Sequence, residues 1–272
     1  LSWNALAISA LAEAGAVLQR PDYIEAATSC ADFIWQQMRD SQGSLLRTWR
    51  QGEARLNAYL EDHAFMVEGL LSLYRANFSA ASFKRAQALA ETMIDRFSDP
   101  DRGGFFTTSH DHEVLIAKRK DVGDHPIPAG SSAAALGLLH LGALTGEDHY
   151  TRHALSVLKL LAPATARQPD AFGHLLQALD FYLSPSGEFA LISPEAGGDA
   201  QGTQAMLDVF HESFRPKVML AAGPEGSDSP ELLADRPAVD GSATAYLCEN
   251  FTCSAPSTDP NTMRSEINGI NS

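Results

Sequence analysis

Apolar residues along most of the chain recur every three to four positions, which is the spacing of one face of an α-helix. Over residues 56–76 these positions are Leu56, Leu60, Ala64, Val67, Leu71 and Tyr74. A helix with such a stripe buries that side against a core. The same spacing predicts further helices at residues 2–18, 22–39, 82–97, 129–144, 148–161 and 169–183.

The predicted helices follow one another in pairs that are joined by short turns. The second helix of a pair opens with an aromatic residue followed by small ones, as in Tyr23-x-x-Ala26 and Phe83-x-x-Ala86. Small residues at these spacings let helices pack closely. Repeated helical hairpins of this length predict an α/α solenoid or a closed α/α toroid, and an irregular helical bundle is the alternative.

Extended segments interrupt and follow the helices. They are residues 43–50, 104–107, 114–119, 188–193 and 217–222. The last two flank a helix-like stretch at residues 203–214, and this order predicts a small α/β insertion. We therefore assign residues 1–185 to helical hairpins, residues 186–262 to the α/β insertion and closing segment of the same domain, and residues 263–272 to a disordered tail.

Composition and charge limit the classes of function. The chain has 272 residues, of which 44% are hydrophobic and 20% charged, as in an ordinary globular protein of one large or two small domains. Its net charge of −14 repels phosphate backbones and anionic lipids, so we predict neither nucleic acid nor a membrane as a partner. No apolar run approaches the roughly 20 residues that cross a bilayer.

The three cysteines of the chain give no indication of a redox or metal site. Cys30 lies on the apolar side of a predicted helix and is interpreted as core. Cys248 and Cys253 are separated by four residues, whereas a thioredoxin-type redox pair has two, so we interpret them as structural. No neighbouring Cys or His completes a zinc site, and we predict no metal and no cofactor. The odd count favours a reducing compartment, and we predict a cytoplasmic location.

The chain begins at Leu1, without an initiator methionine, and helical spacing starts almost at once. We interpret it as a truncated piece of a longer protein. Such a piece would expose helix faces that other helices cover in the whole molecule, so we expect self-association through the exposed face.

Several stretches together resemble one known family. They are Ser2-Trp3-Asn4-Ala5-Leu6, Tyr59-Leu60-Glu61-Asp62-His63-Ala64, Gly103-Gly104-Phe105-Phe106-Thr107-Thr108, Lys118-Arg119-Lys120-Asp121 with Pro128-Ala129-Gly130-Ser131-Ser132, and Cys248-Glu249-Asn250-Phe251-Thr252-Cys253 with Thr258-Asp259-Pro260. Over nearly the whole chain, the sequence is similar to the C-terminal half of the thioredoxin-domain-containing YyaL/spermatogenesis-associated protein 20 family.

The resemblance implies a thioredoxin-like domain followed by an (α/α)6 toroid like that of six-hairpin glycosidases and sugar 2-epimerases. This sequence contains neither the thioredoxin-like domain nor all the toroid helices. The expected fold is therefore mainly α, an incomplete (α/α)6 toroid with a small α/β insertion near the C-terminus. The family's own reaction is poorly defined, so the resemblance points to the fold more than to the chemistry.

The strongest candidate for chemistry is the run Glu61-Asp62-His63 at the start of the third predicted helix. Successive helical residues point about 100° apart, so at least one of the three lies beside the apolar stripe. Either the three groups satisfy one another as a helix cap, or they line a wet pocket. We predict them as catalytic, with Asp62 and His63 facing a central cavity and Glu61 pairing sideways with Arg50 or Arg55.

Further polar and aromatic residues are expected around the same cavity. The predicted substrate-binding residues are Trp3, Asn4, Trp49, Arg50, Asn57, Lys120 and Asp121, and the starts of nearby elements add Asp124, His125, Asp170 and His174. Aromatic rings stack on the CH faces of sugars, while carboxylates or histidine transfer protons. Helix caps, core packing and surface ion pairs are the structural alternatives for these residues.

Two functions from different classes follow. The first is a carbohydrate-active enzyme of glycosidase or sugar-epimerase type that acts on a small carbohydrate through Glu61, Asp62 and His63. The second is a non-catalytic binding or scaffold module that serves the thioredoxin-like domain implied by the resemblance.

Overall fold

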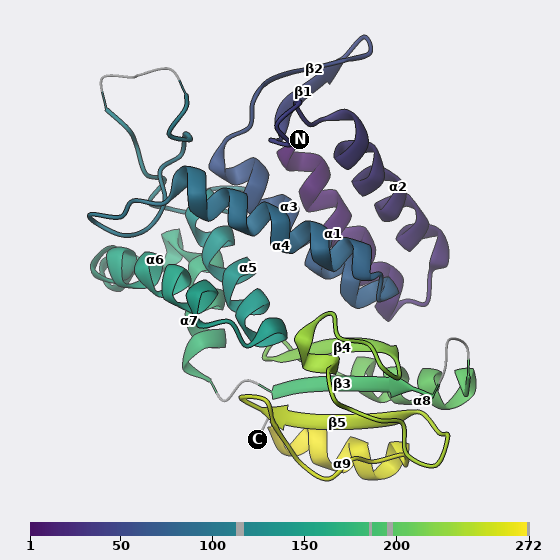
Figure 1. Ribbon diagram of the computed structural model, residues 1–272. Helices are drawn as coiled ribbons and strands as arrows, with labels where there is room; N and C mark the ends of the chain where they lie inside the picture. Colours follow the sequence, from purple (N-terminus) through teal and green to yellow (C-terminus); the bar gives the residue numbers. More distant parts are fainter. Residues whose placement is uncertain (113–116, 185–186, 195–197, 271–272) are drawn as a thin grey trace. The chain divides into compact units, whose positions relative to one another are not determined.

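The computed structural model describes residues 1–112, 117–184, 187–194 and 198–270 (Figure 1). The chain divides into two compact units. The helical unit comprises Leu1–Leu139 and Asp148–Asp180, and the sheet unit comprises His140–Glu147 and Phe181–Ser272. The division therefore differs from the predicted boundary after residue 185, because residues 140–145 and 181–183, which end two helices, already belong to the second unit.

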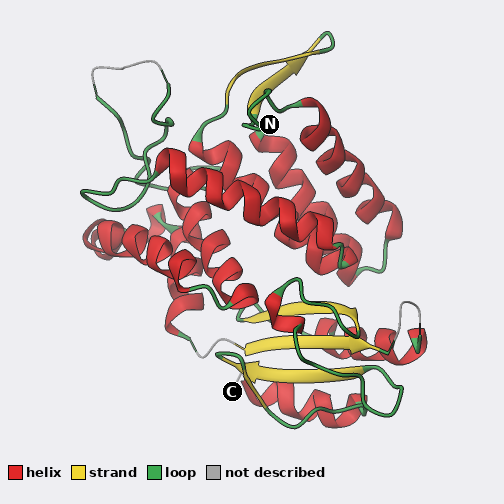
Figure 2. Ribbon diagram, viewed as in Figure 1, coloured by secondary structure: helices red, strands yellow, loops and turns green. Residues whose placement is uncertain are grey.

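Helical hairpins make up the helical unit (Figure 2). Its elements are α1 (Ser2–Val17), α2 (Pro21–Gln37), α3 (Leu60–Asn77), α4 (Ala80–Phe97), the first part of α5 (Gly130–Thr145), α6 (Asp148–Arg167), the short 3₁₀ helix η1 (Pro169–Ala171) and the first part of α7 (Gly173–Leu183). The buried faces of these helices are apolar, as the three-to-four-residue spacing predicted.

Helices α1 and α3 approach each other closely at a glycine. A Cβ atom on Gly69 would lie 2.9 Å from the carbonyl oxygen of Ala5 and 3.4 Å from a methyl group of Ile8. Ala5 and Ile8 are fully buried. The absence of a side chain at Gly69 therefore sets the distance between the two helices.

A short hairpin precedes α3. Strands β1 (Leu46–Arg50) and β2 (Glu53–Asn57) pair antiparallel, with Thr48 opposite Arg55. The predicted helix start at residue 56 is wrong, because Leu56 and Asn57 belong to β2 and Leu56 has a φ of 65°. The Leu56 side chain is 66% exposed, so it forms no part of the buried stripe.

The sheet unit contains a four-stranded mixed sheet in the order β4-β3-β5-β6. Its strands are β3 (Gly187–Ser193), β4 (Val218–Pro224), β5 (Thr244–Glu249) and β6 (Thr252–Cys253). Strands β3 and β4 are parallel and are joined through α8 (Ala200–His211), while β5 runs antiparallel to β3. The predicted β–α–β segment is thus present, and β5, β6 and α9 extend it.

The last helix, α9 (Pro260–Ile270), contradicts the predicted disordered tail at residues 263–272. Met263 and Ile267 are fully buried, and α9 contacts both α8 and β5. Arg215 donates hydrogen bonds to the carbonyl of Ile267 and to the Asn268 side chain. Burial of the apolar side of α9 therefore orders residues 263–270, and the last two residues lie outside the described ranges.

Two predicted strands differ from the structure. Residues 104–107 form no strand, and Phe105 makes only an isolated bridge with Ser98. Of the segment predicted at 114–119, residues 117–119 are not strand and residues 114–116 lie outside the described ranges.

The predicted fold class, mainly α with helical hairpins and a small α/β part near the C-terminus, is confirmed. Closure of the hairpins into a ring stays a prediction. Within the described residues, no helix combines the length and the apolar character needed to cross a membrane.

Candidate functional site

A polar cavity of about 370 Å³ opens at the N-terminal end of α3. It is lined by Arg47, Tyr59, Leu60, Glu61, Thr107, Thr108, Asp121 and Gly130. The loop carrying the threonines is fixed to α3, since the Leu60 N–H donates to the Thr107 carbonyl over 3.0 Å. The start of α5 also lies close, because a Cβ on Gly130 would come within 2.9 Å of the Glu61 nitrogen.

Glu61 is the member of the predicted catalytic run that lines this cavity. Its carboxylate accepts a 2.8 Å hydrogen bond from Nη2 of Arg47. Hydrogen bonds to Glu61 and Asp62 raise the pKa of the Arg47 guanidinium, although its partial burial acts in the opposite direction. Glu61 pairs with Arg47 and not with the predicted Arg50 or Arg55, because Arg47 on β1 points toward α3 whereas Arg55 pairs with Glu53.

Asp62 is fully buried and satisfied by protein donors. Its carboxylate accepts hydrogen bonds from the backbone N–H of Ser2 at 3.0 Å and of Tyr59 at 2.9 Å, and from Nη1 of Arg47 at 2.7 Å. Asp62 therefore caps α3 and ties it to α1 and β1. This arrangement corrects the expectation that Asp62 faces the cavity.

His63 also points away from the 370 Å³ cavity. Its ring packs on Phe97 with centroids 5.0 Å apart, and Nδ1 lies 3.1 Å from the Tyr59 carbonyl. Burial lowers the pKa of His63, so the ring is neutral near pH 7. A separate cavity of about 20 Å³ beside it holds no more than a single water. The predicted inward orientation of His63 is therefore wrong.

The tryptophans that were predicted to bind substrate do not line the 370 Å³ cavity. Trp3 is 77% exposed on α1, and Trp49 packs edge-on against Phe33 with centroids 5.3 Å apart. Asn4 and Arg50 are exposed and do not line the cavity. The aromatic side chain that does line it is Tyr59, over which the Arg47 guanidinium lies at 4.7 Å from the ring centroid.

The remaining predicted binding residues are divided between three places. Asp121 is exposed and lines the 370 Å³ cavity together with Glu61. Lys120 instead pairs with Asp99 over 2.7 Å and donates to the Gly103 carbonyl, which makes it a support for the neighbouring turn. Asn57 is exposed on β2 and borders the small cavity beside His63.

A second polar cluster in the helical unit joins α3 to α7. Nε2 of His174 lies 2.9 Å from a carboxylate oxygen of Glu68, and the Asp124 carboxylate accepts from the His174 backbone N–H at 2.8 Å. The hydrogen bond to Glu68 raises the pKa of His174 against the effect of burial. His174 and Asp124 were predicted as site residues from the sequence, but Glu68 was not. The one indication of Glu68 in the sequence was the position of a carboxylate beside the apolar stripe of α3.

Among the residues that the structure describes, no group of three or more His, Cys, Asp or Glu side chains is placed to hold a metal ion.

The chain has homologues among known proteins. No protein-family model matches the chain. Spermatogenesis-associated protein 20 of Homo sapiens is 31% identical over 280 residues, which is 97% of this chain. The chain is a homologue of part of spermatogenesis-associated protein 20. The predicted family resemblance is thus confirmed.

The homology is to a segment of larger proteins. The mouse spermatogenesis-associated protein 20 is also 31% identical over 97% of the chain, and an uncharacterised protein of Caenorhabditis elegans is 25% identical over 94% of it. The chain spans 35% of the length of the human spermatogenesis-associated protein 20.

Two solved structures of sugar epimerases are similar to part of this chain. Cellobiose 2-epimerase from Bacillus thermoamylovorans has a TM-score of 0.41 at 12% identity and matches 67% of this chain and 45% of its own. The enzyme from Spirochaeta thermophila has a TM-score of 0.37 at 19% identity, over 78% of this chain and 51% of its own. Likenesses this partial say nothing about the chemistry of this chain.

Proposed function

We propose that the helical unit binds a small carbohydrate in the 370 Å³ cavity and acts on it with Glu61 and Asp121 as the acid/base pair. The observation that carries the proposal is the presence of both carboxylates on the lining of one cavity. The volume lies in the range of small-molecule sites, which is about 300–1,000 Å³. Glycosidases use two carboxyl groups that flank the scissile bond.

The other lining residues suit a polyhydroxylated ligand. The Thr108 hydroxyl can donate and accept hydrogen bonds, as sugar hydroxyls require of their partners. The Thr107 hydroxyl donates to the Arg119 carbonyl at 3.1 Å and can accept a hydrogen bond from a sugar hydroxyl. The Tyr59 side chain, 39% exposed, adds aromatic surface to the cavity for the CH groups of a pyranose. Arg47 holds the Glu61 carboxylate in one orientation, and Asp62 holds Arg47 from its buried side.

In this proposal Asp62 and His63 support the site without touching the substrate. Asp62 fixes the start of α3 and the position of Arg47, and neutral His63 fills the space between α3 and Phe97. The proposed catalytic set is therefore narrower than the run Glu61-Asp62-His63 predicted from sequence.

A non-catalytic module is the second candidate function. It is favoured by the internal use of the Asp62 carboxylate and of the Arg47 guanidinium, which are satisfied by protein groups and not held in reserve for a substrate. In this case the cavity binds a ligand without transforming it.

A saccharide screen tests both candidates. Mono- and disaccharides are added to the protein and the melting temperature is measured, because a ligand at 100 times its Kd stabilises by about 2.7 kcal/mol. Asp121→Asn is exposed and should fold normally, yet it should abolish the stabilisation that a saccharide gives the wild type. Glu61→Gln should do the same.

Glu53→Gln is the matched control, since Glu53 also pairs with an arginine but lies on the exposed β2 strand. It should leave the saccharide effect intact. Proton NMR of the stabilising saccharide then separates enzyme from module, because new anomeric or epimeric signals appear only with turnover. If no saccharide stabilises the wild type, or if Asp121→Asn retains the full effect, the cavity is not a carbohydrate site.

A further inference from the structure

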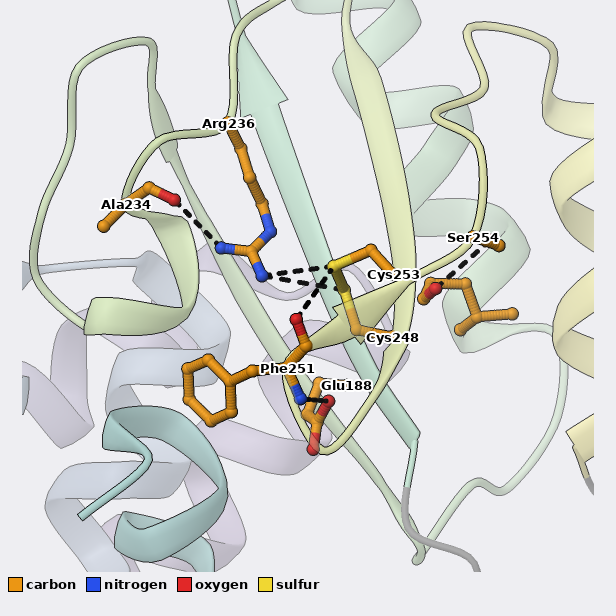
Figure 3. Close-up of a disulfide and its surroundings, with 8 residues drawn as sticks. Glu188, Ala234, Arg236, Cys248, Phe251, Cys253 and Ser254 are labelled. Atoms are coloured by element: carbon orange, nitrogen blue, oxygen red, sulfur yellow. Dashed lines mark hydrogen bonds between the residues drawn. A yellow bond between two sulfur atoms is a disulfide. The ribbon is translucent and has the colours of Figure 1, made fainter.

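The sheet unit contains a disulfide between Cys248 and Cys253 (Figure 3). The two cysteines face each other across the β5–β6 hairpin. The two residues of the turn, Asn250 and Phe251, have positive φ values of 50° and 62°, as in a type I′ hairpin turn. The sequence spacing had predicted a structural role for the two cysteines and had not addressed whether they are bonded.

Other interactions hold this hairpin besides the disulfide. The Phe251 N–H donates to the Glu188 carboxylate at 3.2 Å, and the Ser254 N–H donates to the Leu247 carbonyl at 2.9 Å. The Phe251 ring lies against Gly146, where a Cβ would come within 3.2 Å of it. Because only four residues separate the cysteines, the bond also restricts the unfolded chain less than a long-range disulfide does. The hairpin can therefore keep its form when the bond is reduced.

Arg236 points directly at the two sulfur atoms (Figure 3). Its Nη2 lies 3.1 Å from Sγ of Cys253 and 3.8 Å from Sγ of Cys248, while Nη1 donates to the Ala234 carbonyl at 3.0 Å. Within the described part of the chain, the guanidinium forms no ion pair with a carboxylate, and its buried Nε has no hydrogen-bond partner. Burial lowers the pKa of this guanidinium.

The Arg236 guanidinium favours an added negative charge at the sulfurs, whereas the acidic groups nearby oppose it. A disulfide is a poor acceptor, so in the oxidised state the partly buried cation of Arg236 is incompletely compensated. Glu188 is 3% exposed, and burial raises the pKa of its carboxyl group. Tyr246, Asp235 and Glu249 are the other titratable groups near this site. A thiolate of Cys253 or Cys248 would pair with the guanidinium directly, which no carboxylate of the described residues does.

We infer that Cys248–Cys253 is a redox-active disulfide that exchanges with a dithiol reductant, with Arg236 stabilising the thiolates. A thiolate of the reductant attacks Sγ of half-buried Cys253, and the S–S bond breaks to release Cys248 as a thiolate near Arg236. The second thiol of the reductant then attacks its own sulfur in the mixed disulfide and releases Cys253. Two electrons pass to the protein, the reductant becomes a disulfide, and its two protons are available to the released sulfurs.

The experiment measures the equilibrium with dithiothreitol in a Cys30→Ala background, which leaves only this cysteine pair. Protein is incubated at graded ratios of reduced to oxidised dithiothreitol, and the reduced fraction is read by alkylation and mass spectrometry. Arg236→Met should shift the equilibrium constant toward the disulfide by about tenfold, because the thiolate loses its cation. Arg236→Lys should restore most of the shift.

Arg264→Met is the matched control, since Arg264 pairs with Glu212 on the exposed surface of the same unit and should leave the equilibrium unchanged. A second measurement needs no substitution at Arg236. In the reduced protein of the same background, the rate of alkylation as a function of pH should show one thiol that ionises below the ordinary range. Equal equilibrium constants for Arg236→Met and the control, or ordinary ionisation of both thiols, would make the disulfide a static cross-link and overturn the inference.

Discussion

Arg47 in the helical unit and Arg236 in the sheet unit are both partly buried arginines beside a tyrosine ring, yet the pKa values of their guanidinium groups shift in opposite directions. Arg47 meets two carboxylates, at 2.7 and 2.8 Å, and the pKa of its guanidinium is raised. Arg236 meets two sulfurs and a carbonyl, and burial lowers its pKa. We therefore expect a structural role for Arg47, because its carboxylate partners are always present. We expect Arg236 to take part in chemistry, because its anionic partner would form only when the disulfide is reduced.

The largest expected effect on the free energy of unfolding is that of Arg47→Met, and Arg236→Met is its comparison. Arg47→Met leaves Asp62 buried without its charged partner and should lower the free energy of unfolding by about 3 kcal/mol. Arg236→Met, measured in the oxidised protein, removes a charge that lacks a partner and should lower it by no more than about 0.5 kcal/mol. Urea denaturation followed by circular dichroism gives both values. Equal losses would mean that the two arginines are compensated to the same degree.

A smaller effect separates the two carboxylates of Arg47. Asp62→Asn replaces an oxygen that accepts hydrogen bonds with an amide that donates, and this should cost about 2 kcal/mol because the site is fully buried. Glu61→Gln weakens an ion pair at the edge of the cavity and should cost about 0.5 kcal/mol. The same urea titrations measure both. A larger loss for Glu61→Gln would indicate that Glu61 is the structural residue and Asp62 is not.

The smallest effect concerns the pH dependence of the Glu68–His174 pair. The folded-state pKa of His174 is raised above its ordinary value of 6.5. Its contribution to stability is therefore present below that value and is lost as pH rises through the folded pKa. The stability lost by His174→Gln should accordingly be greater at pH 6 than at pH 8.5, as measured by urea denaturation.

His125→Gln is the control for this titration, because the His125 side chain is exposed. As a surface substitution it should change the free energy of unfolding by less than about 0.5 kcal/mol in the same titrations. A loss for His174→Gln that is independent of pH would show that the pair contributes through packing and not through the proton on His174.

Much of the fold could be predicted from the helical spacing of the apolar residues. The prediction failed where this spacing extends over only a few residues. The helices that became α1, α2 and α4 were predicted to within two residues at each end. Among the side chains of α9 that the structure describes, Met263 and Ile267 are the buried apolar ones, and they span little more than one helical turn. A local signal was present, because Asp259 precedes Pro260 and its carboxylate accepts from the Thr262 N–H as an N-cap does.

The site was predicted less well, because orientation depends on contacts between distant residues. The sequence indicated that Glu61, Asp62 and His63 could not all face one way, but the partner that selects among them, Arg47, lies on a strand 14 residues earlier than Glu61. The disulfide was missed for a related reason. The count of three cysteines is equally consistent with one bond and one free thiol, Cys30, which is what the structure contains.

The close contact at Gly69 has a consequence for the order of folding. The inner side of α1 is covered largely by α3, which is synthesised more than forty residues later. An isolated helix of this length is marginal in water, so α1 remains unstable while the nascent chain lacks Gly69 and its neighbours. Amide hydrogens of α1 should therefore gain protection from exchange together with those of α3, as one cooperative step, and not before them.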